Sequence, residues 1–476
     1  MDETIWSNAL EFEWSNRTFL HPVGLCAIAV LGVAMLCVPR RYAVLPMIVM
    51  ACFIPSGQRL TVFTLDFSLL RIMVLFGWMR ILLRREHRAW VWKFLDGILV
   101  LWSISGVIAT AVRCQAVPPV ISRLGDMFDA VGLYFLFRCI VRDWRDIDAI
   151  VEGIILVSVP VAAAFVVENA TGRNLFSVFG GVPEVTFVRE GRLRCQGAFS
   201  HPILAGCFWA SLMPLVASQW WTGPNSRKWA VVGVLTSGMI ILFSGSSTPV
   251  MAVLAGLLGA CLFPLRYHMQ WVRRCVVLGL LALHMVMNHP VWHLLARIDI
   301  VGGSTGWHRF FLIDQAIKRF GEWWLVGTVS TARWDEYGLL WDVTNQYVSE
   351  GVRGGVLTLA LFLVIIGLAF RSVGYAHRAV RRNARKVVMV WALGVALFVH
   401  CVNFLAVSYF GQVILAWYLL LAMIASVAPV HGMGPRRAHR TVPATPARRD
   451  GGKPAGIQIV PLGGVLLQSE LEKPAV

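Results

Sequence analysis

Long apolar stretches alternate with short polar segments along the chain as far as residue 427. A helix needs roughly 20 mostly apolar residues to cross the hydrocarbon core of a bilayer. The stretches that approach or reach this length cover residues 22–38, 43–54, 60–83, 94–112, 124–141, 147–167, 198–220, 229–243, 250–263, 272–287, 356–370, 387–405 and 407–427. The second, eighth and ninth are short, so the pattern predicts about 12–13 membrane-spanning helices, with about 11 as an alternative.

Composition supports the same class of protein. Apolar residues make up 57% of the chain and charged residues only 14%, against about 45–50% and about 25% in an average soluble domain. The formal net charge of +17 does not indicate a nucleic-acid binder, because the basic residues alternate with apolar stretches instead of forming one face. We therefore predict an all-α fold, a polytopic membrane helix bundle with one large loop between its helices.

Lysine and arginine collect in particular polar segments, at 40–41, 80–93, 138–145, 227–228, 266–274, 371–386 and after 436. With thirteen spans, all of these segments fall on one side of the membrane. The excess of basic residues in cytoplasmic loops assigns that side to the cytoplasm. The N-terminus is then predicted to lie outside and the C-terminus inside.

The polar connections divide the chain into a transmembrane bundle, residues 1–427, and a basic tail, residues 428–476. The tail is rich in Pro, Gly and Arg without periodicity, so we expect it to be disordered, cytoplasmic and near anionic membrane lipids. Two connections on the predicted outer side are long, at 168–196 and about 289–353. Within the second, residues 307–320 have the spacing of an amphipathic helix lying near the membrane surface.

Arginines in these two outer connections oppose the usual topological bias. The first holds Arg189, Arg192 and Arg194, and the second holds Arg309 and Arg319 among others. One interpretation is a solvated surface on which each arginine pairs with nearby acids. As a set they indicate an anionic ligand, because the planar guanidinium donates two parallel hydrogen bonds to a phosphate. His201 precedes Pro202 where the seventh span begins, and it is either part of that site or an interfacial helix cap.

Four stretches resemble the O-antigen ligase and polymerase superfamily. They are Arg194-Cys-Gln-Gly197-Ala-Phe-Ser-His201-Pro202, Phe243-Ser-Gly-Ser-Ser-Thr-Pro249, Arg309 followed by Ala316, Ile317 and Gly327, and Asn345-Gln-Tyr347 with Gly351 to Gly355. They occur in the family's order and span about residues 189–370. The resemblance lies in order, spacing and topology together.

This resemblance implies a type C glycosyltransferase of the bacterial inner membrane, with its N-terminus periplasmic and its C-terminus cytoplasmic. Such enzymes transfer a glycan from undecaprenyl diphosphate to a hydroxyl of a glycan or lipid acceptor at the periplasmic face, and the resemblance implies no cofactor, no metal and no nucleic-acid partner. Arg194 and Arg309 would hold the diphosphate and stabilise its charge as it leaves. Further substrate-binding residues would be Arg192, His201, Arg319, Asn345 and Arg353.

The chain departs from the family at Thr344, where ligases have a histidine before the asparagine. A threonine hydroxyl is a poor general base near neutral pH, whereas imidazole suits that role. Three interpretations follow: Asp342 activates the acceptor as the catalytic base, the chain belongs to a polymerase branch with another arrangement, or it is inactive. Asp342 could instead pair with Arg309 or Arg353.

Two other classes of function compete with the enzyme. A flippase or exporter of a lipid-linked glycan would also need arginines at the outer face. A noncatalytic membrane component of a polysaccharide assembly complex would need no catalytic groups. The sizes of the surface glycans made by a deletion strain would separate these classes.

Overall fold

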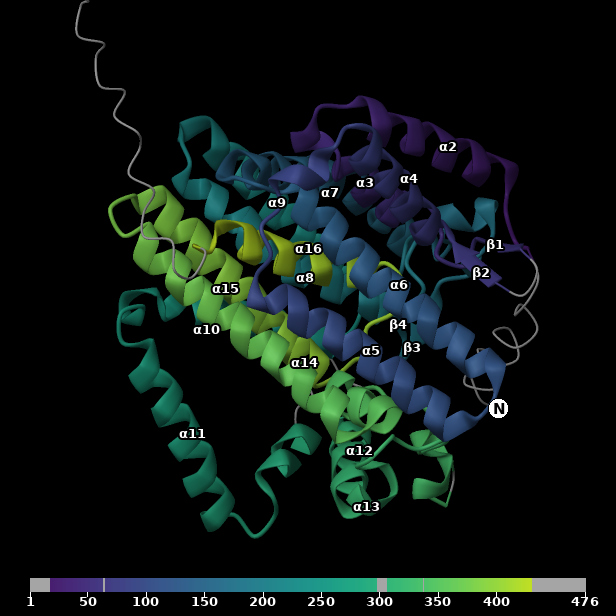
Figure 1. Cartoon of the computed structure of the whole chain (residues 1–476), viewed down its shortest axis with the longest axis vertical. Helices are drawn as coiled ribbons and strands as arrows, with labels where there is room; N and C mark the ends of the chain where they lie inside the picture. The colour runs from purple at the N-terminus through teal and green to yellow at the C-terminus, as the bar shows by residue number, and fades with distance from the viewer. Residues whose placement is uncertain (1–17, 63–64, 298–305, 337, 430–476) are drawn as a thin grey trace, which may run out of the picture. The chain divides into compact units, whose positions relative to one another are not determined.

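The computed structural model describes residues 18–62, 65–297, 306–336 and 338–429. Helices form most of this part of the chain, together with two short β-hairpins (Figure 1). The predicted tail, beyond residue 429, lies outside the described residues.

In the described part, the α-helices are α2 (Pro22–Cys37), α3 (Leu45–Phe53), α4 (Leu69–Leu83), α5 (Phe94–Cys114), α6 (Val117–Ile140), α7 (Trp144–Thr171), α8 (Pro202–Ser218), α9 (Pro224–Phe243), α10 (Ser247–Cys261), α11 (Met269–Val286), α12 (Gly306–Lys318), α13 (Phe320–Trp323), α14 (Gln346–Ala379), α15 (Ala384–Phe404) and α16 (Val413–Val427). Seven of them (α5, α7, α8, α9, α11, α14 and α15) are long and apolar enough to cross a membrane, and α2, α10 and α16 are shorter apolar helices. Each predicted span contains one helix. The chain is an all-α, multi-pass membrane protein, as predicted.

The third predicted span, 60–83, is wrong in its first part. Its beginning belongs to a hairpin, β1 (Arg59–Val62) and β2 (Leu65–Ser68), and the helix starts only at Leu69. Thr61 and Asp66 face each other across the hairpin, and the Thr61 hydroxyl donates a 2.9 Å hydrogen bond to the Asp66 carboxylate. This cross-strand pair stabilises the hairpin locally.

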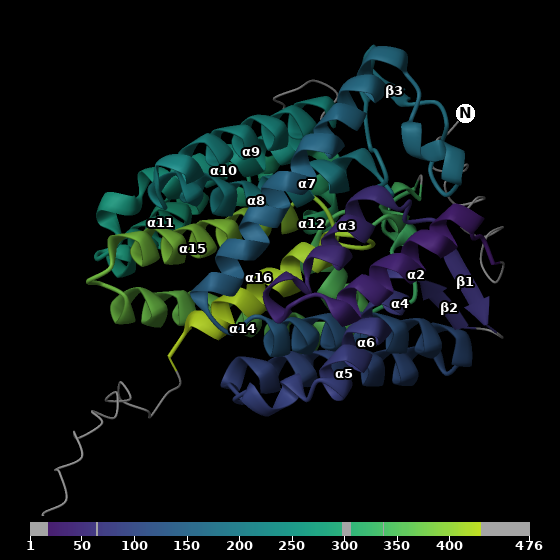
Figure 2. The ribbon, with the colours of Figure 1, turned by 90° about the horizontal axis from the view of Figure 1, so that it is seen from above.

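Helix α8 lies at the centre of the helix packing. It contacts α7, α9, α10, α15 and α16, and Phe208 and Trp209 on it are fully buried. Helix α16, drawn in yellow-green in Figure 2, also runs among the other helices and is buried along most of its length. The N-terminus of α8 is therefore held firmly, and the residues just before it can form a rigid site.

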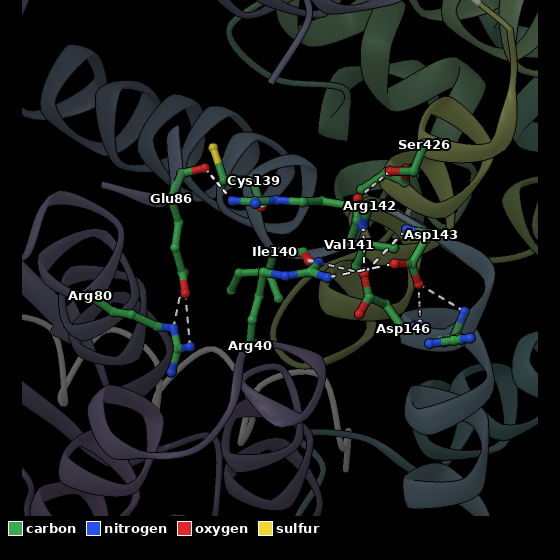
Figure 3. A network of polar contacts seen from close by, with 12 residues as sticks. Arg40, Arg80, Glu86, Cys139, Ile140, Val141, Arg142, Asp143, Asp146 and Ser426 are labelled. Atoms are coloured by element: carbon green, nitrogen blue, oxygen red, sulfur yellow. Dashed lines mark hydrogen bonds and ion pairs between the residues drawn. The ribbon is translucent and has the colours of Figure 1, made fainter. Parts of the chain in front are cut away.

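Three of the predicted cytoplasmic basic segments, 40–41, 80–93 and 138–145, meet at one end of the bundle (Figure 3). Arg40 pairs with Asp143 and Asp146, and Arg80 pairs with Glu86 at 2.9 Å. Arg142 donates to the backbone carbonyl of Glu86. Arg385, from a fourth basic segment, forms an ion pair with Asp148 on α7. The hydroxyl of Ser426 donates a hydrogen bond to the carbonyl of Val141. These contacts bring the basic segments to the same end of the described bundle, and their side of the membrane stays a prediction.

The long connection between α11 and α14 folds around its own small core, formed by Leu312, Ala316, Trp323, Trp334, Leu340 and Val352. The predicted amphipathic helix is α12, although its buried face carries Leu312 and Ala316, and Ile317 is half exposed. Gly355, with φ of 76°, interrupts α14, and a Cβ atom there would lie 2.2 Å from the carbonyl oxygen of Leu325. The glycine therefore lets this connection dock closely on α14.

Candidate functional site

Three arginines of the connection between α7 and α8 lie on a two-stranded hairpin, β3 (Phe187–Arg189) and β4 (Arg192–Arg194). The turn at 190–191 has φ of 49° and 74°, as in the tight turns that join antiparallel strands. Phe187 is opposite Arg194, and Arg189 is opposite Arg192. Since opposite and alternate positions share a face, all three arginines project from the same side of the hairpin.

Arg194 is buried at the base of this hairpin. Its guanidinium lies 5.8 Å from the ring centre of Phe187, and the backbone N–H of Cys195 donates a 2.9 Å hydrogen bond to the carbonyl of Phe243. Gly245, with φ of 55°, packs against the strand, and a Cβ atom there would lie 2.9 Å from Cγ of Arg194. The Ser-rich stretch at 243–249 thus holds Arg194 in place.

Glu168, at the end of α7, fixes the segment that follows β4. Its two carboxylate oxygens accept hydrogen bonds from the backbone N–H groups of Gln196 (3.0 Å) and Gly197 (2.9 Å). The hydroxyl of Thr186 donates a third hydrogen bond, at 3.3 Å. This buried carboxylate therefore serves the backbone and shapes the path from Arg194 to His201.

His201 is the N-cap of α8. Its Nδ1 accepts a 3.1 Å hydrogen bond from the backbone N–H of Ile203, which leaves Nε2 as the proton donor. Desolvation, and then the charges of Arg194 and Arg189, lower the pKa of His201 to about 4. The imidazole is neutral at pH 7, and its Nδ1 caps the helix near Arg194 and Arg189.

Arg309, on the inner face of α12, is 8% exposed. Its Nη2 donates a 2.8 Å hydrogen bond to Oγ1 of Thr248, while its Nε is buried without a hydrogen-bond partner. Desolvation lowers the pKa of Arg309, Arg189 acts in the same direction, and the nearby Cys207 thiol opposes the shift. No carboxylate of the described residues pairs with this guanidinium.

These residues form one cluster, which we call the arginine site: Arg189, Arg194, His201, Thr248 and Arg309. Burying a cation is costly unless an opposite charge compensates it. The buried guanidinium of Arg309 has Arg189 near it and no carboxylate partner among the described residues, and this favours an anionic ligand. The first three family-like stretches therefore come together in space.

Asp342 follows a short 3₁₀ helix, η8 (Leu339–Trp341), and remains accessible to solvent. The protein atoms around it raise its pKa by desolvation, and the nearby His308 opposes the shift. The pKa of His308 is in turn lowered by desolvation, which Asp342 opposes. The close titratable neighbour of Asp342 is thus His308, one residue before Arg309. The hydroxyl of Thr344 is buried without a hydrogen-bond partner in the described structure.

The other predicted substrate-binding residues lie in different surroundings. Asn345 caps α14: its side chain accepts from the N–H of Val348 and donates to the carbonyl of Leu405, both at 3.0 Å. Arg319 pairs with Glu322 at 3.1 Å. Arg353 is exposed on α14, and Arg192 lies near the hairpin tip, opposite Arg189. The described contacts of Asn345 and Arg319 are structural and do not join them to the arginine site.

The sequence did not predict Thr248 or His308 as individual residues of the site. Thr248 was only one of several small polar residues in the 243–249 stretch, and His308 was one polar residue in a long connection. A hydrogen bond that joins residues 61 positions apart leaves no local sequence signal.

Together, the fold and this cluster define a multi-pass membrane protein with an arginine-rich site near the N-terminus of α8, in which Arg194 and Arg309 are buried. No family model matches the chain, and no curated protein matches it.

Proposed function

We propose that the chain is a bacterial inner-membrane glycosyltransferase, a polysaccharide polymerase or an O-antigen ligase-like enzyme. It transfers a glycan from undecaprenyl diphosphate to an acceptor hydroxyl at the periplasmic face. The observation that carries this proposal is the buried guanidinium of Arg309, which lies near Arg189 and has no carboxylate partner in the described structure. A lipid diphosphate supplies two phosphoryl groups to such a site, at the depth of the membrane surface.

In the proposed reaction the acceptor oxygen bonds to the anomeric carbon of the donor sugar, and the bond from that carbon to the diphosphate oxygen breaks. Undecaprenyl diphosphate leaves with the bonding electron pair. Arg194 and Arg309 stabilise the negative charge that grows on it, because they are fixed by Gly245 and Thr248 before the reaction begins. Nε2–H of His201 can donate to the same oxygens.

The acceptor hydroxyl must also lose its proton. Asp342 is the proposed base, since Thr344 cannot take this role and the carboxylate of Asp342 remains accessible. His308 beside it would stabilise the arrangement. This use of a carboxylate instead of the family's histidine favours a polymerase or exopolysaccharide enzyme over a lipid A–core ligase.

The proposal is tested by Arg194→Ala and Arg309→Ala in a deletion strain, with surface glycans sized by gel. Both variants should insert in the membrane and lose transfer, and Arg194→Lys should lose much of it, because an ammonium cannot form the bidentate contact. Arg173→Ala is the matched control: Arg173 lies in the same connection, is exposed and pairs with Glu184 at 3.4 Å.

Each class of function has its own outcome. Polymer shortened to single repeats indicates a lost polymerase, and polymer left on the carrier indicates a lost ligase. Substrate stranded on the inner leaflet would instead favour an exporter. Wild-type glycans in either alanine variant would remove that arginine from the site.

A further inference from the structure

A second feature of the connection between α11 and α14 is a cavity of about 530 Å³. Its lining includes Trp307, Phe311 and Gln315, which recur every four residues on α12. At 100° per residue, this stripe lies nearly opposite Arg309, which points to the arginine site. One face of α12 thus carries Arg309, and the opposite face lines the cavity. The cavity is therefore separate from the arginine site. We call it the loop cavity.

An aromatic surface forms one wall of the loop cavity. The rings of Trp307 and Phe311 stack with centroids 4.7 Å apart and planes 15° from parallel. Trp307 is 58% exposed, so much of this surface is open. Trp334 adds a third aromatic ring, which is buried and held by a 3.0 Å hydrogen bond from its Nε1 to Glu322. Rigid, open aromatic faces pack well against flat ligands that have an apolar side.

The polar groups of the loop cavity are balanced in charge. Arg319 and Arg333 are matched by Asp335 and Glu336 in the lining. Arg319 also lies within 3.4 Å of the amide oxygen of Gln315. Unlike the arginine site, this lining does not favour a polyanion. It offers several hydrogen-bond donors and acceptors beside an aromatic wall, within the size range of small-ligand sites.

We propose that the loop cavity binds a neutral sugar residue of the glycan substrate, which packs against the exposed ring of Trp307 where that ring stacks on Phe311. The ring of a neutral sugar has an apolar C–H face for the aromatic wall and hydroxyl groups for the polar lining. The inference rests on the proposed function in one respect: it takes the ligand to be part of the glycan being transferred or extended. A helix is about 10 Å wide, so the bound sugar would lie one or more units from the reacting one.

His308 connects the two faces of α12. It lines the loop cavity, lies near Asp342 and immediately precedes Arg309. A glycan that runs from the loop cavity past His308 would bring its reacting end to the proposed base and the diphosphate. Binding energy from the remote sugar would then position the reacting one.

The inference is tested by saccharide binding to the purified full chain in detergent, measured by saturation-transfer NMR. The probes are maltotriose, mannotriose and triacetylchitotriose, with inorganic pyrophosphate as an anionic competitor. At least one trisaccharide should bind saturably, and Trp307→Ala should weaken its binding about tenfold, or about 1.4 kcal/mol. Trp307→Phe keeps an aromatic wall and should retain most of the affinity.

Trp324→Ala is the matched control, because Trp324 is an exposed tryptophan of the same connection that does not line the cavity. It should bind as the wild type does. The inference is overturned if no trisaccharide binds, if Trp307→Ala and Trp324→Ala behave alike, or if pyrophosphate displaces the sugar. Trisaccharide binding that depends on Trp307 in a chain without transferase activity would support the sugar site and count against the proposed function alone.

Discussion

Nη2 of Arg309 donates a 2.8 Å hydrogen bond to Oγ1 of Thr248, and this bond joins the long connection between α11 and α14 to the first turn of α10. Both residues are buried. The threonine thereby sets the direction of a guanidinium that has no carboxylate partner among the described residues. Removing the Thr248 hydroxyl tests whether the direction of this guanidinium matters for glycan transfer.

Thr248→Val keeps the shape of the side chain and removes the hydroxyl acceptor. A buried charged donor left without its acceptor costs about 1–3 kcal/mol, so glycan transfer should fall roughly tenfold or more in a membrane assay. Thr248→Ser should stay near wild type. Thr171→Val, at an exposed threonine, is the control. Full transfer by Thr248→Val would show that Arg309 is oriented in another way.

Gly245→Ala should disrupt the arginine site by steric contact. Gly245 and Gly172 both have positive φ, 55° and 68°, but a Cβ atom at Gly245 would lie 2.9 Å from Arg194, whereas Gly172 has open space around it. Both alanine variants carry the backbone strain, and only Gly245→Ala carries the clash. Its thermal stability and glycan transfer should be the lower of the two, measured on the purified chains. Equal losses in Gly245→Ala and Gly172→Ala would show that backbone strain alone, and not the contact with Arg194, causes the effect.

The His201 imidazole should make stability depend on acid pH. Its pKa is about 4 in the folded chain, against an ordinary value of 6.5. Between these values the unfolded chain takes up a proton that the folded chain does not, so stability should fall as the pH drops from about 6.5 to about 4. His201→Asn keeps an N-cap acceptor without titrating. Its melting temperature should fall less over this range, and parallel curves would contradict the assignment.

Asp342→Asn should lower turnover with little change in substrate binding, because it keeps the shape of the side chain and removes the base. Desolvation raises the pKa of Asp342, so wild-type turnover should decline as the pH falls through that raised value, and the variant should lack this decline. Thr344→His should be neutral or harmful. Wild-type turnover by Asp342→Asn would leave catalysis to the arginines alone.

The predicted orientation can be measured with reporters at the two ends of α14. A reporter fused after Arg382 should report cytoplasm, and one inserted near Trp334 should report periplasm. Helix α14 has 34 residues and is long enough to separate these points across a bilayer. Reporters that land on one side would refute the thirteen-span topology.

The hydrophobic pattern alone located every helix of the described bundle. This succeeds because a backbone inside a membrane must satisfy its hydrogen bonds within each segment, and a helix does so locally. The basic segments are predicted to share the cytoplasmic side, and Arg40, Arg80 and Arg142, from three of them, lie close together at one end of the bundle. The predicted start of the span 60–83 was wrong, because its first residues form a hairpin. The pairing of Thr61 with Asp66 across that hairpin depends on a partner strand, which a helical pattern does not record.

The sequence also singled out Arg194 and Arg309, since arginines in connections that are predicted to lie outside oppose the topological bias. Only the tertiary structure decided what surrounds them. The register of β3 and β4 places Arg189 on the same face as Arg194, and the hydrogen bond between Arg309 on α12 and Thr248 on α10 joins the two stretches. Such contacts join residues far apart in the chain, so no local propensity or periodicity records them.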